Sequence, residues 1–107
     1  MGLLETYIEC FRTGDAVRLA SLFVDDGVFY DDAAVKIGND PVVVKGRDRI
    51  EAFFAQLFRQ GGRKVTSVGI NGNAMRYDVE VANMVISALG VMKEEGNLIK
   101  EYRVIAV

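Results

Sequence analysis

Apolar residues recur at helical spacing through the first sixty positions of the chain, which predicts three helices there. The first covers residues 3–13 and ends at Gly14, a residue type that suits the left-handed position after a helix. Asp15 can cap a second helix, which we extend to Phe23. The third opens at residues 46–48 and carries a core face of Ile50, Phe53, Phe54, Leu57 and Phe58.

Beyond Gly61-Gly62 the apolar period changes from about 3.6 residues to about two, which indicates β-strands. An acidic turn at residues 25–26 precedes a short apolar strand over 27–31, and the long loop after it contains a candidate edge strand at 42–44. Turn signals separate the strands that we predict over residues 63–71, 74–82, 84–93 and 98–106.

Helices followed by a run of sequential strands predict an α+β fold, in which a curved antiparallel sheet wraps over three N-terminal helices. The chain has 107 residues and half of them are apolar, which is enough for one core. We therefore expect a single domain over residues 1–107.

Charge and the length of the apolar runs argue against two classes of partner, nucleic acids and membranes. Thirteen basic and fifteen acidic residues give a net charge of −2 without a basic block, so nucleic acid is not expected. No apolar run has the length of a membrane span, and we expect a cytoplasmic protein.

Apolar residues on both faces of the predicted sheet favour a homodimer through that sheet; they include Val79, Val81, Val85 and Val91.

The residue types also limit the chemistry. The chain has no histidine and a single cysteine, Cys10, which excludes Ser-His and Cys-His nucleophile pairs and most zinc sites. The acidic pairs lie on opposite strand faces or in turns, so no metal or cofactor is implied. Acid–base chemistry would have to use carboxylates, tyrosines or lysines.

Four motifs spread along the chain resemble the nuclear-transport-factor-2-like superfamily, which includes SnoaL-like proteins, ketosteroid isomerases and limonene epoxide hydrolases. They are Gly14-Asp15, Leu22–Asp26, Gly46–Ile50 with Phe53, and Gly96–Ile99 leading to Tyr102-Arg103. The resemblance implies a conical α+β barrel with a deep apolar pocket between sheet and helices.

The ketosteroid isomerases suggest one set of catalytic residues. In that family a first-helix tyrosine and a protonated acid bind the substrate oxygen, and a first-strand aspartate moves the proton. Tyr7 and Asp31 match the tyrosine and the base, and Ser87 falls near the position of the second acid. A core aromatic remains an equal interpretation of Tyr7.

The limonene epoxide hydrolases suggest another set. Their Arg-x-Asp motif is matched by Arg76 and Asp78, which period-two geometry places on one strand face. Val104 stands where that family has its base, and Phe29 where it has a tyrosine. Asp31 could replace the base, with Asp78 as acid and Arg76 between them; a structural ion pair is the alternative. A one-residue bulge would turn Asp32 rather than Asp31 inward.

Three functions therefore stay open. The first is an isomerase or epoxide hydrolase type of enzyme that uses carboxylate acid–base chemistry on a small apolar substrate. The second is a non-catalytic binder of a hydrophobic ligand, and the third is a homodimeric interaction module. For the first two, the expected ligand contacts are Phe29, Phe54, Ser87, Tyr102 and Val104.

Overall fold

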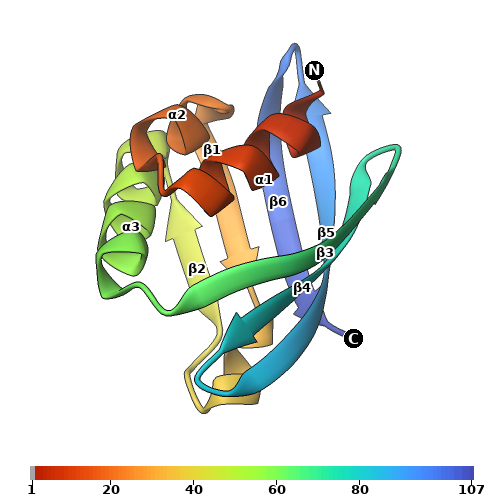
Figure 1. Cartoon of the computed structure of the whole chain (residues 1–107). Helices are drawn as coiled ribbons and strands as arrows, with labels where there is room; N and C mark the ends of the chain where they lie inside the picture. The colour runs from red at the N-terminus through yellow and green to blue at the C-terminus, as the bar shows by residue number, and fades with distance from the viewer. Residues whose placement is uncertain (1) are drawn as a thin grey trace.

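Helices cover the concave face of a curved six-stranded sheet in the computed structural model, which describes residues 2–107 (Figure 1). The predicted α+β class is confirmed. The elements in chain order are α1 (Leu3–Thr13), α2 (Ala16–Ser21), β1 (Phe23–Asp31), the 3-10 helix η1 (Ala33–Ile37), β2 (Val42–Lys45), α3 (Arg47–Gln60), β3 (Arg63–Asn71), β4 (Ala74–Val81), β5 (Met84–Glu95) and β6 (Leu98–Ala106).

The strand order in the sheet is β2-β1-β6-β5-β4-β3. Every neighbouring pair is antiparallel except β1 and β6, which pair in parallel. Because β2 and β3 form the two edges, the sheet stays open rather than closing into a barrel. The C-terminal end of β1 and the start of β3 both lie below the helices in the view of Figure 1.

The second helix is shorter than the sequence pattern predicts. It ends at Ser21, and Phe23 already pairs with Ile99 of β6. The Ile99 N–H donates to the Leu22 carbonyl at 2.7 Å. Pairing with β6 therefore overrides the helical pattern, and β1 begins four residues before the predicted strand at 27, with an irregularity between Phe23 and Val28.

The acidic residues of that irregular stretch form ion pairs. The Arg47 guanidinium lies 2.7 Å from the Asp25 carboxylate and donates two hydrogen bonds, at 2.9 and 2.7 Å, to the Phe23 carbonyl. Lys100 pairs with Asp26 at 2.8 Å. The first of these contacts fastens the start of α3 to β1.

The four later strands lie within two residues of their predicted bounds. The turn between β4 and β5 consists of Ala82 and Asn83, with φ of 49° and 66°. Two consecutive left-handed residues are typical of the tight turns that match the twist of a hairpin. The 3-10 helix in the long loop is not predicted by the sequence pattern.

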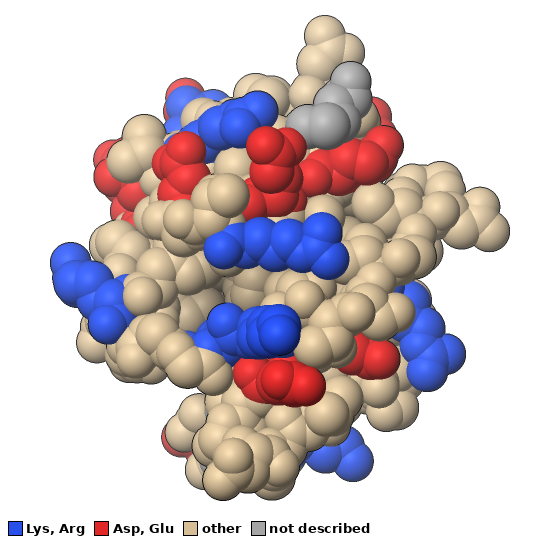
Figure 2. Space-filling model, in the orientation of Figure 1, with Lys and Arg blue, Asp and Glu red and all other residues tan. Residues whose placement is uncertain are grey.

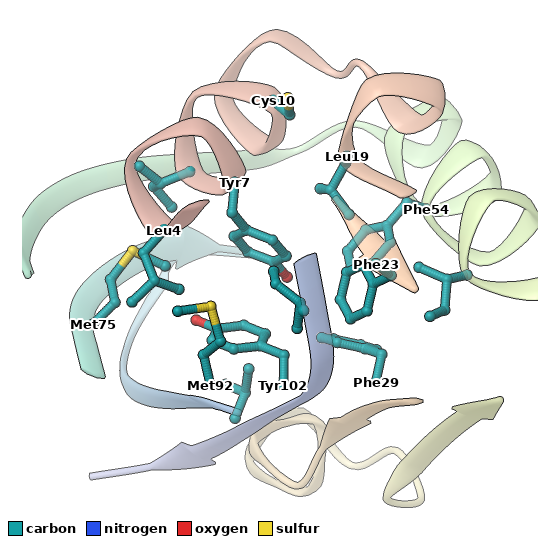
Figure 3. Close-up of a cluster of buried hydrophobic side chains, with 14 of the residues drawn as sticks. Leu4, Tyr7, Cys10, Leu19, Phe23, Phe29, Phe54, Met75, Met92 and Tyr102 are labelled. Atoms are coloured by element: carbon teal, nitrogen blue, oxygen red, sulfur yellow. The ribbon is translucent and has the colours of Figure 1, made fainter. Parts of the chain in front are cut away.

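Aromatic side chains join the two layers (Figure 3). The ring of Tyr7 from α1 lies 4.7 Å from that of Tyr102 from β6, and Phe54 from α3 lies 4.9 Å from Phe29 of β1. All four residues are at most 3% exposed. Burial of these large rings supplies much of the hydrophobic driving force for docking the helices on the sheet.

Charge is dispersed on the surface. In the view of Figure 2, acidic side chains are most frequent near the helices at the top, and basic side chains are interspersed with acidic and uncharged ones. None of the helices within residues 2–107 is both long and apolar enough to cross a membrane.

Gly90 makes a close approach that no larger residue could make. A Cβ atom at this position of β5 would overlap the Tyr102 hydroxyl and ring. Because Tyr102 is fully buried among other aromatic rings, its side chain has little room to retreat. Gly69, on β3, has no atom within 4 Å of such a Cβ, and its φ is not left-handed.

We predict that Gly90→Ala lowers the free energy of unfolding by about 1–3 kcal/mol, the usual cost of overpacking. Gly69→Ala, the same change in an open strand position, should leave stability unchanged or raise it slightly. Urea denaturation followed by circular dichroism measures both. Equal effects of the two substitutions would contradict the tight contact between Gly90 and Tyr102.

Candidate functional site

A pocket of about 260 Å³ lies between the concave face of the sheet, α1, α3 and η1. Its wall is mainly apolar, because the inward residues of β1, β4, β5 and β6 meet the apolar face of α3 there. Apolar wall residues include Phe29, Phe53, Phe54, Val79, Ile86 and Val104. An apolar cavity with a few polar groups is the usual form of a small-molecule site.

Five of the residues expected at the functional site from the sequence line this pocket: Tyr7, Phe29, Asp31, Phe54 and Val104. They come from four different elements, so only the folded chain brings them together. The parallel pairing of β1 with β6 sets Asp31 opposite Val104 and Phe29 opposite Tyr102.

Asp31 ends β1 and is the carboxylate that faces the pocket. Its Oδ1 accepts a hydrogen bond from the Ala33 N–H at 2.9 Å. Burial raises the pKa of this carboxyl, and the charge of Asp32 adds to the rise; the backbone N–H groups of Ala33 and Ala34, and the charge of Arg63, act in the opposite direction. The next carboxylate, Asp32, pairs instead with Arg103 at 3.7 Å.

Two tyrosines also line the pocket. Tyr7 and Tyr77 are almost fully buried, and burial raises the pKa of both phenols, with a further contribution from the Asp31 charge. Both therefore stay neutral and can donate a hydrogen bond to a ligand oxygen. The structure assigns neither hydroxyl a hydrogen bond to another side chain or backbone group among the described residues.

Tyr77 is a pocket residue that our sequence reasoning missed. Its neighbours at odd-numbered positions, Met75 and Val79, are apolar and buried, whereas Arg76 and Asp78 alternate with them. That alternation was a signal for the inward direction of Tyr77.

The same alternation corrects the expectation for Arg76 and Asp78. They share one face of β4, as predicted, but it is the outer face of the sheet and not the pocket face. Ser87 of β5 pairs with Asp78 across the ladder and has the same orientation. None of these three residues lines the pocket, because the apolar residues of both strands occupy its wall.

Tyr102 is the remaining residue expected at the site, and it lies behind the pocket wall. It is fully buried in the aromatic cluster, and burial raises the pKa of its phenol. Its hydroxyl has no hydrogen-bond partner in the described part of the chain. Tyr102 therefore supports Tyr7 and Phe29, whose ring centroids lie 4.7 and 6.3 Å away.

Polar residues on loops and element ends complete the pocket. Asn39 follows η1, Gln60 ends α3 and Arg63 begins β3. Their positions depend on how these ends meet in space, so no local sequence pattern indicates them. Within residues 2–107, no group of three His, Cys, Asp or Glu side chains is placed to hold a metal ion.

The arrangement can support proton transfer. A partly buried carboxylate with a raised pKa is a stronger base than an ordinary carboxylate and can accept and return a proton, and neutral phenols can stabilise negative charge on a nearby oxygen. The apolar wall would keep water away from both.

The fold is that of the nuclear-transport-factor-2-like class, also described as cystatin-like. The SnoaL-like domain profile matches residues 4–86, and the chain belongs to that family. A comparison with curated proteins finds no match.

Solved structures with the same fold are distant in sequence. A protein from Sphaerobacter thermophilus superposes with a TM-score of 0.78 at 17% identity, over 98% of this chain and 93% of that one. An NTF2-like protein from Mesorhizobium loti gives 0.76 at 14%, over 98% and 88%. A ketosteroid-isomerase-like protein from Catenulispora acidiphila, in complex with trimethylamine, gives 0.70 at 14%, over 96% and 83%. These likenesses show the fold alone.

We predict that Asp31→Asn raises the melting temperature at pH 7. The folded protein holds the Asp31 pKa above its ordinary value of 3.8, so the group contributes most to stability in acid and loses that contribution as pH rises through the folded pKa. The amide keeps an oxygen for the Ala33 N–H but carries no charge to desolvate.

The gain in stability of Asp31→Asn over the parent should therefore be present at pH 7. It should be absent well below pH 3.8, where Asp31 of the parent is protonated in both the folded and the unfolded state. Thermal unfolding of the two proteins across this range measures it. An Asp31→Asn protein that is less stable than the parent at pH 7 would contradict the desolvation of the Asp31 carboxylate.

Proposed function

We propose that the protein acts on a small, largely apolar molecule in its pocket by proton transfer, as isomerases do, with Asp31 as the base. One observation carries the proposal: a carboxylate whose pKa is raised by burial lines an apolar pocket beside two neutral phenols. This combination is costly for folding and suited to proton transfer.

In the proposed reaction, Asp31 takes a proton from a carbon next to a carbonyl group. The electron pair of the broken C–H bond moves toward the carbonyl oxygen, which accepts hydrogen bonds from Tyr7 or Tyr77. In a substrate with a C=C double bond next to the deprotonated carbon, Asp31 then returns the proton to the far carbon of that double bond, so that the double bond moves into conjugation with the carbonyl and no atom is lost.

The pocket favours this chemistry over epoxide opening. Asp31 is the acidic side chain that lines it among the described residues, whereas Arg76 and Asp78 face away. Opening an epoxide by the scheme expected from the sequence would need both a base and a separate acid at the substrate.

A hydrophobic-ligand binder without catalysis is the second candidate. The observation in its favour is that a structural relative with a ketosteroid-isomerase-like fold was solved in complex with the small molecule trimethylamine. The same pocket would then serve for binding, and Asp31 would be a polar anchor rather than a base.

Deuterium exchange at the α-carbon of monocyclic ketones should distinguish these functions. We predict that the protein accelerates this exchange in D2O, measured by proton NMR, and that Asp31→Asn lowers the rate by at least about 100-fold, the usual contribution of a positioned base. Asp78→Asn is the matched control, since Asp78 lies on the outer face of the sheet and away from the pocket, and it should keep the parent rate.

Exchange that persists in Asp31→Asn would contradict Asp31 as the base. If the parent protein binds the monocyclic ketones without catalysing exchange, and Asp31→Asn still binds them, the pocket is a binding site alone.

We further propose that two copies associate through the outer sheet face. Leu89 pairs with Ile105 across the ladder, next to Val91, and Ile105 and Val91 are 40% and 44% exposed. Val85 of the same strand is 62% exposed, whereas Val79 and Val81 line the pocket. A second copy would cover these side chains with an equivalent apolar surface.

Ile105→Glu should shift the protein from dimer to monomer, because it places a charge at the centre of this face. Val17→Glu is the control, since Val17 is 65% exposed on α2, away from the sheet. Sedimentation equilibrium at micromolar concentrations measures both. A monomeric parent protein would overturn the proposed dimer.

A further inference from the structure

Arg63 differs from the other partly buried basic residues of the protein. Three lysine or arginine side chains within residues 2–107 belong to residues that are neither fully buried nor exposed: Arg47, Arg63 and Lys100. Arg47 pairs with Asp25 at 2.7 Å and Lys100 pairs with Asp26 at 2.8 Å. Arg63 has no carboxylate within 4.0 Å among the described residues, although it lines the pocket.

The guanidinium of Arg63 also makes little use of its donors. Its one hydrogen bond to the described chain runs from Nη1 to the Gly61 carbonyl, at a long 3.4 Å. A guanidinium has five N–H donors in a planar fork, whose geometry fits the two oxygens of a carboxylate. A charged group that gives up part of its hydration without a partner is costly, so a ligand that supplied one would gain affinity.

Asp31 does not supply that partner. Both side chains line the same pocket, yet they lie beyond ion-pair distance, which leaves room for a ligand between them. The Asp31 carboxylate already accepts a hydrogen bond from the Ala33 N–H, at 2.9 Å. The charged pocket residue without a partner is therefore Arg63, so the ligand group expected there is an anion rather than a cation at Asp31.

Two amides stand at the pocket with Arg63. Gln60 closes α3 three residues before it, and Asn39 lies on the loop after η1; both are exposed and both line the pocket. Their NH₂ groups are donors that could share the oxygens of an anionic group. Arg63, Gln60 and Asn39 therefore add nitrogen donors to a pocket whose other polar lining residues are Asp31 and the two tyrosines.

The apolar part of the pocket limits the size of the ligand. A dry cavity of roughly 150 Å³ is known to hold benzene, and drug-sized ligands occupy roughly 300–1,000 Å³. This pocket, of about 260 Å³, lies between those values. Phe29, Phe53 and Phe54, with ring centroids 4.9–5.6 Å apart, offer an aromatic wall for a single ring.

We propose that the pocket takes a small monocyclic carboxylate, with its ring against the phenylalanine wall and its carboxylate paired with Arg63. The inference deepens the proposed function by naming its substrate class, and it rests on that function only in taking the pocket as the working site. A substrate of this class would carry, besides the carboxylate held by Arg63, the carbonyl group next to which Asp31 takes the proton.

Three probes of one shape and different charge test this inference: phenylpropionate, phenylpropionamide and phenylpropylamine. Isothermal titration calorimetry should show that the parent protein binds the carboxylate at least about tenfold more tightly than the amide, and that the amine binds most weakly. Arg63→Gln should lose this preference, with amide affinity unchanged, and Arg63→Lys should keep part of it because lysine retains the charge without the fork.

Arg76→Gln is the matched control, because Arg76 lies on the outer sheet face and its loss should not change any of the three affinities. Circular dichroism checks that each variant is folded; if Arg63→Gln is not, the preference of the parent and its reduction in Arg63→Lys decide the question. Equal binding of carboxylate and amide, preference for the amine, no binding of any probe, or an equal loss of all three affinities in Arg63→Gln would overturn the inference.

Asp31→Asn separates this inference from the proposed function. The substitution should abolish deuterium exchange while the preference for phenylpropionate persists, because the anion site does not depend on Asp31. If the parent protein catalyses no exchange but still prefers phenylpropionate, the enzymatic function is contradicted and the ligand class is not. Catalysis without the preference would do the reverse.

Discussion

The packing of Tyr7 and Phe54 against Tyr102 and Phe29 is the interaction on which the rest of the structure depends. It docks α1 and α3 on the concave face of the sheet, and the tight fit requires glycine at position 90, where Tyr102 meets β5. Tyr7, Phe29 and Phe54 of this cluster also line the pocket. Asp31, two residues after Phe29, lines the same pocket and is partly removed from water there.

The acidic residues around β1 show how differently one short segment can use the same side chain. Asp25, Asp26 and Asp32 each have a basic partner at the surface, which satisfies their charge at little cost. Asp31 has backbone N–H groups near it and an apolar pocket in front of it, and its charged form is disfavoured. A carboxylate placed in this way weakens the fold, and sites that do so are commonly functional.

Elements whose signals are local could be predicted from the sequence. The first helix and the hairpin strands follow from periodicity and turn residues, and the resemblance to known families pointed to Tyr7 and Asp31, which the fold brings to one pocket. The end of the second helix was wrong, because β6 captures Phe23 as a strand residue. Helical spacing cannot report a partner that is about seventy-five residues away in the chain.

The face of a strand is harder to predict than its bounds. Period-two geometry correctly grouped Arg76 with Asp78, and the buried Met75, Tyr77 and Val79 alternate with them on the inward face. The expectation that Arg76 and Asp78 face the pocket came from the family resemblance and ran against this local signal. Arg63 gave no signal at all, because its role depends on where the start of β3 meets the end of α3. Charge partners that are missing, as at Arg63, become visible only in three dimensions.

The fold holds Asp31 as a desolvated carboxylate in the pocket. A pH titration of the Asp31 side-chain carboxyl carbon by NMR, assigned by comparison with Asp31→Asn, tests this placement. The structure predicts an inflection above the ordinary value of 3.8. An inflection at or below that value would show a hydrated or ion-paired carboxylate and would contradict the account.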